Sequence, residues 1–358
     1  MGRDGPHYIV VTSVPGRLPP RQKQIVKFDR RRQGGVMHTR RSAPSPSAML
    51  LGILCWLAAG SMAAGAADFL DPHGKGDGFR FTELPDRLVI THTHRPVAEF
   101  VFRDAKILRP YFRNVHVPNG VQATRNHPPI AGVDATDHDT MHPGLWLAFG
   151  DINGTDFWRN KGRMEHVRFL EPPAVRDGRL VFSTECRLLT TGGETICSLT
   201  NHLSLESQTN AWLLRWDASF ASQELDFTFG DQEEMGFAAR VSTPLTESNG
   251  GLITSSAGLK SAKATWGQAA DWCDYSGTVD GQRVGITLFT HPQNFRASWW
   301  HNRDYGVFVA NPFGRAAMKQ GVASAVTVKR GEPFRLRFAA AIHAGEGYDP
   351  AVAYRRLW

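Results

Sequence analysis

Short strand-like segments recur along most of this chain and constrain its fold more than any other feature. Segments such as "DRLVITHTHRPVAEFVF" and "AWLLRWDASFAS" alternate apolar and polar residues, and Gly, Pro, Asn or Asp interrupts them every eight to twelve residues or so. Two interruptions, "RDGR" at 176–179 and "VDGQR" at 279–283, are typical of Asp-Gly hairpin turns. Helix signals are scarce, although Asp349 and Pro350 suit the cap and first position of a short C-terminal helix.

So many strands usually divide between two packed sheets. No internal repeat and no Gly/Ser-rich linker interrupts the strand-bearing part of the chain. We therefore predict an all-β fold, a large two-sheet antiparallel β-sandwich with few short helices. It is expected to form a single domain over residues 67–358, after a leader at 1–66.

The leader accounts for the basic character of the chain. The net charge is +7, but residues 1–66 hold ten Lys or Arg and two Asp, a net of +8, which leaves −1 for the rest. A neutral body does not support a nucleic-acid surface. Apolar residues from Met49 to Ala59, followed by Ala64-Gly65-Ala66, are typical of a signal peptide, with an uncleaved membrane anchor as the alternative. We expect a secreted or periplasmic protein that meets a membrane only through an uncleaved leader.

Three cysteines lie in the body. Cys186 and Cys197 lie at equal distances from the centre of a Thr-Thr-Gly-Gly turn, so the two strands would place them opposite each other. They would form either a disulfide or two buried thiols. Cys273 is expected to be a thiol in the core.

The segment "TDHDTMHPGLWLAFGDINGTDFW", residues 136–158, combines polar chemistry with apolar surface. Its His138 and His142 have the i, i+4 spacing of a two-histidine metal site, although Pro143 follows at once. Asp137, Glu165 and His166 could complete such a site; otherwise the polar side chains cap loop amides. Trp158 would be either a core anchor or a stacking platform.

Three further stretches bring aromatic and polar residues together: "RPYFRNVHVPNG", "QAADWCDYSG" and "HPQNFRASWWHNRDYG". This mixture suits a polyhydroxylated ligand, whose C–H faces stack on rings while its hydroxyls pair with polar groups. The candidates are Arg109, Tyr111, Asp271, Trp300, His301 and Asp304. The sequence has no Gly-x-Ser-x-Gly elbow, Walker loop, dinucleotide fingerprint or Cys-x-x-Cys, which excludes the corresponding enzyme classes.

Four blocks in this order, from "RPYFRNVHVPNGVQATRN" to "RDYGVFVANPFG", resemble a bacterial family labelled PmoA family protein, or methane oxygenase PmoA, a domain of unknown function. The family pattern Asp-His-Pro-His-His-Arg-Gly-Leu-Trp is matched by Asp137, His138, His142, Gly144, Leu145 and Trp146. Asp139 replaces the proline, Pro143 replaces the arginine, and one residue is inserted. The resemblance implies a β-sandwich similar to galactose-mutarotase-like proteins, in bacteria that degrade polysaccharides.

The leading hypothesis is a carbohydrate-active protein, a hydrolase, lyase or epimerase acting on a sugar. His138 and His142 would be its acid–base pair, with Asp271 or Glu165 as the carboxylate. The substrate would contact Arg109, Tyr111, Asp137, Trp158, His166, Trp300, His301 and Asp304. One alternative is a non-catalytic sugar-binding module. The other is a metal-dependent oxygenase or hydrolase with His138, His142 and His166 as ligands; otherwise no cofactor is expected.

Overall fold

Antiparallel strands pair into two eight-stranded sheets, which confirms the predicted all-β sandwich. The structure, a computed structural model, describes residues 78–358, so the leader expected over residues 1–66 lies outside the described part. The first sheet has the order β1(Phe79–Glu83), β2(Arg87–His92), β3(Arg95–Val101), β4(Tyr111–Arg113), β5(Leu145–Phe149), β11(Met235–Arg240), β16(Val307–Asn311), β15(Trp299–Trp300).

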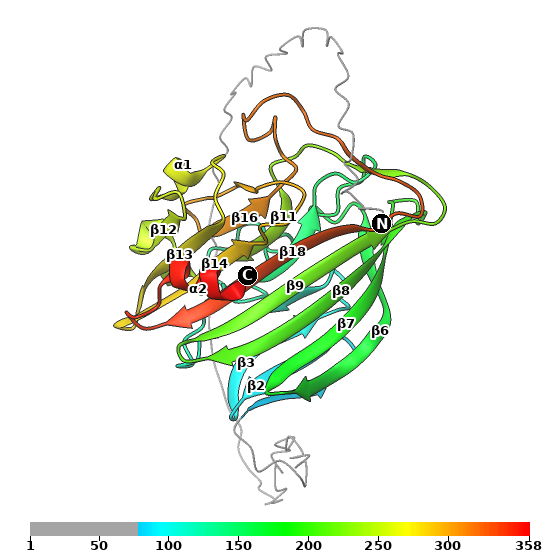
Figure 1. The fold of residues 1–358 in the computed structure, drawn as a ribbon. Helices are drawn as coiled ribbons and strands as arrows, with labels where there is room; N and C mark the ends of the chain where they lie inside the picture. Colours follow the sequence, from blue (N-terminus) through cyan, green and yellow to red (C-terminus); the bar gives the residue numbers. More distant parts are fainter. Residues whose placement is uncertain (1–77) are drawn as a thin grey trace, which may run out of the picture. The chain divides into compact units, whose positions relative to one another are not determined.

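The second sheet contains the longest strands and lies in front in Figure 1. Its order is β12(Leu252–Ser255), β13(Trp272–Val279), β14(Gln282–Thr290), β18(Phe334–Ala344), β9(Ala211–Ala221), β8(Thr195–Gln208), β7(Arg179–Leu189), β6(Arg163–Arg176). A small third sheet pairs β10(Phe227–Phe229) with β17(Val326–Val328).

The alternation seen in the sequence places the core between the two large sheets. In β5, Leu145, Leu147 and Phe149 face this core, which also contains Trp216 of β9 and Phe338 of β18. Residues at alternate positions point to the other face of a strand. Each sheet therefore has an inner, apolar face and an outer face that loops, a helix or solvent must cover.

Turn chemistry fixes the strand connections as predicted. The Asp-Gly pairs at 177–178 and 280–281 all have positive φ, and Arg176 pairs with Arg179 and Val279 with Gln282 across these turns. Asp and Gly tolerate that left-handed backbone, which is why they suit a two-residue hairpin.

The helices are short. Helix α2(Pro350–Leu357) begins where the sequence predicts: the Asp349 carboxylate accepts hydrogen bonds from the amides of Ala351 and Val352. It covers part of the outer face of the second sheet. The others are α1(Ala262–Thr265) and two 3₁₀ turns, η1(Thr243–Leu245) and η2(Glu247–Asn249). Within residues 78–358, no helix is both long and apolar enough to cross a membrane.

The cysteine hairpin departs from the expected symmetry. Cys186 pairs with Leu199 and Cys197 with Leu188, because the register shifts between Leu188 and Leu189. A β-bulge adds one residue to one strand and displaces every pair beyond it. The two cysteines are therefore buried free thiols, as is Cys273.

Candidate functional site

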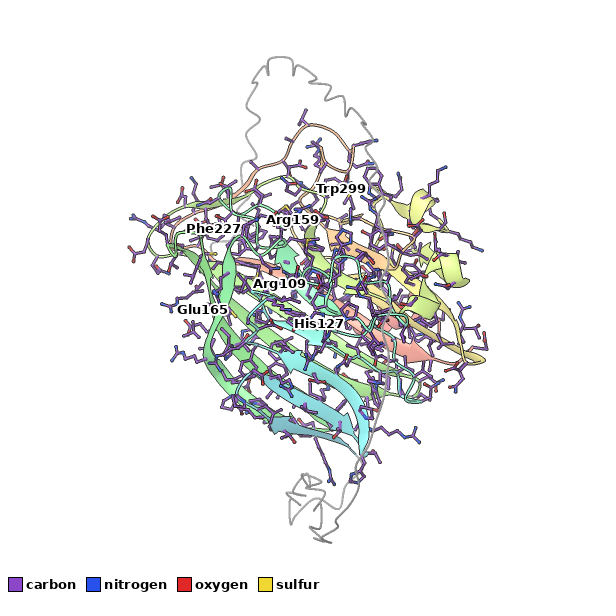
Figure 2. All side chains as sticks on the ribbon, turned by 180° about the vertical axis from the view of Figure 1, so that it is seen from behind. Arg109, His127, Arg159, Glu165, Phe227 and Trp299 are labelled. Carbon is purple, nitrogen blue, oxygen red and sulfur yellow. The ribbon has the colours of Figure 1, made fainter. Side chains whose placement is uncertain are left out.

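The outer face of the first sheet carries a second apolar layer. Trp146 and Ala148 of β5 point to it, together with Ala238 of β11 and Val309 of β16. The connection between β3 and β4 supplies Ile107 to the same layer, and the connections before and after β5 supply Met141 and Trp158, so these loops cover this face. Figure 2, seen from behind, shows Arg109, His127 and Arg159 over this face, which we call the loop-covered face.

A tight turn over this face gathers Asp137, His138 and His142. The amide of His142 donates to the carbonyl of His138 at 3.0 Å, and the two imidazole rings stack with centroids 4.9 Å apart. Asp137 Oδ2 lies 2.7 Å from His138 Nδ1. One potential ligand atom from each residue lies within 4.8 Å of the others, and no other such group of three His, Cys, Asp or Glu occurs in residues 78–358.

Arg240, at the end of β11, holds this cluster on the sheet. Its Nη1 and Nη2 donate to the two carboxylate oxygens of Asp137 at 3.0 and 2.9 Å, and its Nη1 lies 3.5 Å from His142 Nδ1. The guanidinium also lies 4.6 Å from the ring centroid of Tyr305, which stacks on His138 at 5.9 Å. Two bonds from one planar guanidinium fix the orientation of the carboxylate.

Two more buried arginines hold the turn by its backbone. Arg125 donates to the carbonyls of Ala135, Asp137 and His142 at 2.8, 2.6 and 3.1 Å. Arg109 donates to the carbonyl of Met141 at 2.5 Å and to that of Trp158 at 2.9 Å. Burial lowers the pKa of Arg109 to about 9 and that of Arg125 to about 10, so both stay charged at neutral pH.

Burial and charge set the protonation states of the cluster. His142 is 2% exposed, and burial, with Arg240 next to it, holds its pKa well below the ordinary value. It is therefore a neutral imidazole, and its Nε2 has no hydrogen-bond partner. Burial would raise the pKa of Asp137, but the hydrogen bonds from Arg240 and His138 outweigh it and lower that pKa, so Asp137 is ionised. The Arg240 guanidinium can only donate, so His142 Nδ1 is the acceptor and the neutral ring carries its proton on Nε2, from which it can donate. His138, whose Nδ1 faces the Asp137 carboxylate, has its own Nε2 available to accept a proton.

A second polar group lies on the same face. His301 and Arg303 run beside β16, since their amides donate to the carbonyls of Val309 and Val307. Glu233 Oε2 lies 3.1 Å from His301 Nδ1 and 2.7 Å from Arg303 Nη2. The nearby His301 imidazole contributes most to lowering the pKa of Glu233, so this partly exposed carboxylate is ionised. Arg303 also lies beside the Tyr305 hydroxyl, which connects this group to the histidine cluster.

A groove of about 760 Å³ opens near the histidine turn. Along its lining, Gln122 bonds Asn126, and Asn126 and Thr243 both bond the Asp134 carboxylate. Asp134 stands three residues before Asp137, so their Cα atoms are at most about 11 Å apart. Amide and hydroxyl side chains give the groove hydrogen-bonding capacity without a cationic lining residue.

The sequence candidates divide into those that reach the loop-covered face and those that do not. The candidates that lie on the loop-covered face include Asp137, His138, His142, Arg109, Trp158 and His301. Tyr111 lies there too, but it is buried and donates to Asp104 at 2.6 Å. Asp304 lines a neighbouring cavity of about 370 Å³, and its backbone carbonyl accepts from Glu247 and Tyr275.

Four candidates lie elsewhere, contrary to the expected gathering. Trp300 points into the core between the sheets, because alternation in β15 turns it inward. Glu165 pairs with Arg187 on the second sheet and lies near the edge in Figure 2. His166 packs on Phe102 and Phe169, so it is not in the Asp-His-His group. Asp271 is an exposed residue before β13.

Sequence reasoning missed the residues that organise the cluster: Arg125, Glu233, Arg240 and Tyr305. A signal existed for Arg240, since it ends the otherwise uncharged buried strand "MGFAAR". A charged residue in such a strand is rarely buried unless it is paired. Its partner Asp137 lies 103 residues earlier, which spacing alone does not reveal.

Comparison with known proteins identifies the family but not an activity. No curated protein matches the chain. Among solved structures, it is similar to a variant of the GH36 α-galactosidase AgaA from Geobacillus stearothermophilus in complex with stachyose, with 11% identity and a TM-score of 0.35. That match covers 75% of this chain and 40% of the galactosidase chain.

It is also similar to a galactose mutarotase-like protein from Lactobacillus casei, with 9% identity and a TM-score of 0.32, over 75% of this chain and 100% of that chain. The model of the family of unknown function DUF6807 matches residues 87–356. The expectation drawn from the resemblance to the PmoA, or methane oxygenase, family is therefore wrong. The chain belongs to the family of unknown function DUF6807.

Proposed function

We propose that the protein is a carbohydrate-active enzyme whose sugar substrate binds at the Asp137–His138–His142 cluster. One observation carries the proposal. A buried, neutral imidazole with an unpartnered Nε2 stands beside an ionised carboxylate, a partly exposed second imidazole and the Tyr305 phenol. Hydroxyl groups of a sugar would pair with such donors and acceptors, and proton transfer at a hydroxyl or at a carbon next to a carbonyl needs such a base.

The residues would divide the work as follows. His138 Nε2 would accept the proton and His142 would donate a hydrogen bond from Nε2, while Asp137 and Arg240 hold the imidazole pair in place. Burial raises the pKa of Tyr305, so its phenol stays protonated and would donate a hydrogen bond. The groove beside Asp134 would accommodate further sugar units of a longer substrate.

A panel of monosaccharides and oligosaccharides, read by thermal shift, tests the proposal, since a ligand that binds the folded form raises the melting temperature. The hit is then assayed for turnover. We expect His142→Gln, which keeps most of the buried volume, to abolish turnover in a protein that melting curves show to be folded, and Glu165→Gln on the other sheet to leave turnover intact. Binding without any turnover would leave a sugar-binding module, and no binding would overturn the proposal.

A divalent cation is the second candidate ligand of the cluster, favoured by the convergence of Asp137, His138 and His142 within 4.8 Å. Three protein ligands with open positions suit a catalytic zinc site. Arg240 engages both carboxylate oxygens of Asp137, so a cation would have to displace a permanent positive charge. Elemental analysis after incubation with Zn²⁺ and dialysis decides: one ion per chain, lost in His138→Ala, supports a metal site.

The proposed substrate class fits an exported protein. The signal-like leader supports export, and the N-terminal sequence of the mature protein tests it. A mature chain that begins near Ala67 is the expected result. Retention of the leader on a membrane-bound protein would favour the anchor instead.

A further inference from the structure

The outer face of the second sheet carries a transverse row of polar side chains. Glu171 of β6 pairs with Ser183 of β7, Ser183 with His202 of β8, His202 with Asp217 of β9, and Asp217 with Arg337 of β18. Residues paired across neighbouring strands point to the same face. The five side chains therefore line up across five strands, on the sheet that does not carry the histidine cluster.

Hydrogen bonds order the first three members of the row. The hydroxyl of Ser183, which is 2% exposed, lies 2.7 Å from His202 Nδ1 and 3.3 Å from Glu171 Oε2. The register of β6 shifts on both sides of Glu171. Bulges of this kind turn a side chain away from its regular direction. A buried hydroxyl thus ties a carboxylate and an imidazole together.

These side chains line a hollow of about 280 Å³. Trp358 also lines it and is 38% exposed. The indole is held in place by the ring of His291, with centroids 4.3 Å apart, and the His291 amide donates to the carbonyl of Arg337. The hollow thus has an aromatic wall at the Arg337 end of the row.

The charges of the lining balance. Glu171 and Asp217 are matched by Arg215 and Arg337, and Asp217 also pairs with the neighbouring Arg335. Mixed donors and acceptors with no excess charge suit neutral hydroxyl groups, whereas an anion would find no net positive charge to attract it. An exposed indole suits the C–H face of a sugar ring.

We propose that this hollow binds a sugar unit of a neutral glycan and is a second carbohydrate site, separate from the histidine cluster. It would hold the protein on a polymeric glycan and takes no part in proton transfer. The site stands on its own geometry, so it can exist whether or not the cluster on the first sheet is catalytic.

The test uses the full chain and an array of neutral and uronate-containing oligosaccharides, followed by calorimetric titration of the strongest neutral binder. We expect Trp358→Ala and His202→Ala each to weaken binding at this site about tenfold or more. Arg187→Ala, an exposed residue of the same sheet outside the hollow, is the matched control and should bind like the unmodified protein. Melting curves verify that each variant is folded.

His142→Ala separates the two proposals. If binding survives His142→Ala and falls in Trp358→Ala and His202→Ala, the second site is supported. If binding falls only in His142→Ala, the glycan occupies the first sheet and the second site is overturned while the proposed function stands. Preference for uronate-containing glycans, or no glycan binding at all, also overturns it.

Discussion

At the scale of single residues, arginines rather than histidines hold the candidate site in its conformation. The spacing of His138 and His142 made them visible in the sequence, and the turn does bring their rings together. Arg240 and Arg125 were invisible because their partners are backbone carbonyls or residues far away along the chain. Periodicity reports which face a residue occupies, but it does not report which distant group that residue meets.

Arg240→Ala should lower the free energy of unfolding by about 2 kcal/mol, less than for a fully buried ion pair because Asp137 is 37% exposed. Urea denaturation measures it. Arg187→Ala, which breaks an exposed pair with Glu165, is the control and should cost within about 0.5 kcal/mol. Equal effects of the two substitutions would contradict the anchoring role of Arg240.

His166 should make stability depend on pH. Burial lowers its pKa to about 4 in the folded protein from an ordinary value of 6.5. Above pH 6.5 the imidazole is neutral in both the folded and the unfolded protein, so the free energy of unfolding is not reduced by this group. As the pH falls from 6.5 to 4, the unfolded chain takes up the proton first, and stability falls by up to about 1.4 kcal/mol per pH unit for this proton. Urea denaturation at several pH values should give a shallower decline for His166→Gln; parallel declines would exclude this role.

At the scale of elements, the sequence predicted those features that a few neighbouring residues determine. The Asp-Gly turns and the start of α2 follow from two or three neighbouring residues, and both were predicted. The register around Cys186 and Cys197 was not, because a β-bulge is decided by packing on both strands rather than by the turn residues. The same limit applied to β6, whose register shifts turn Glu171 toward Ser183.

Removing the cap of α2 tests this local control. Asp349→Ala leaves the amides of Ala351 and Val352 without their acceptor and should cost about 1 kcal/mol. Asp349→Asn keeps a side-chain oxygen at the same position and should cost only a small part of that. Thermal unfolding compares the two variants, and equal losses would mean that the carboxylate does not cap the helix.

At the scale of the molecule, the two sheets and their shared core could be read from alternation alone. The layer of connections over the first sheet could not, since loops lack a period and are held here by individual polar bonds. Arg109, which lies just before β4, makes two of these bonds. It donates to the carbonyl of Met141 in the turn and to that of Trp158 after β5. The loops over the first sheet should therefore unfold locally more readily than the strands of the sandwich.

Hydrogen exchange on Arg109→Met tests that difference. We expect faster exchange of amides in residues 138–142 and 157–160, with strands β7 to β9 unchanged. Loss of protection throughout the chain would mean that the loops and the sandwich unfold as one unit.

The carbonyl groups that accept hydrogen bonds from Arg109 and Arg125 belong to the backbone, which every residue type possesses. Apart from Asp137, whose carboxylate Arg240 holds, side chains along the turn can therefore be exchanged while these backbone hydrogen bonds remain. Relatives of this chain could acquire new chemistry at that spot by substitution alone, with the supporting frame inherited intact.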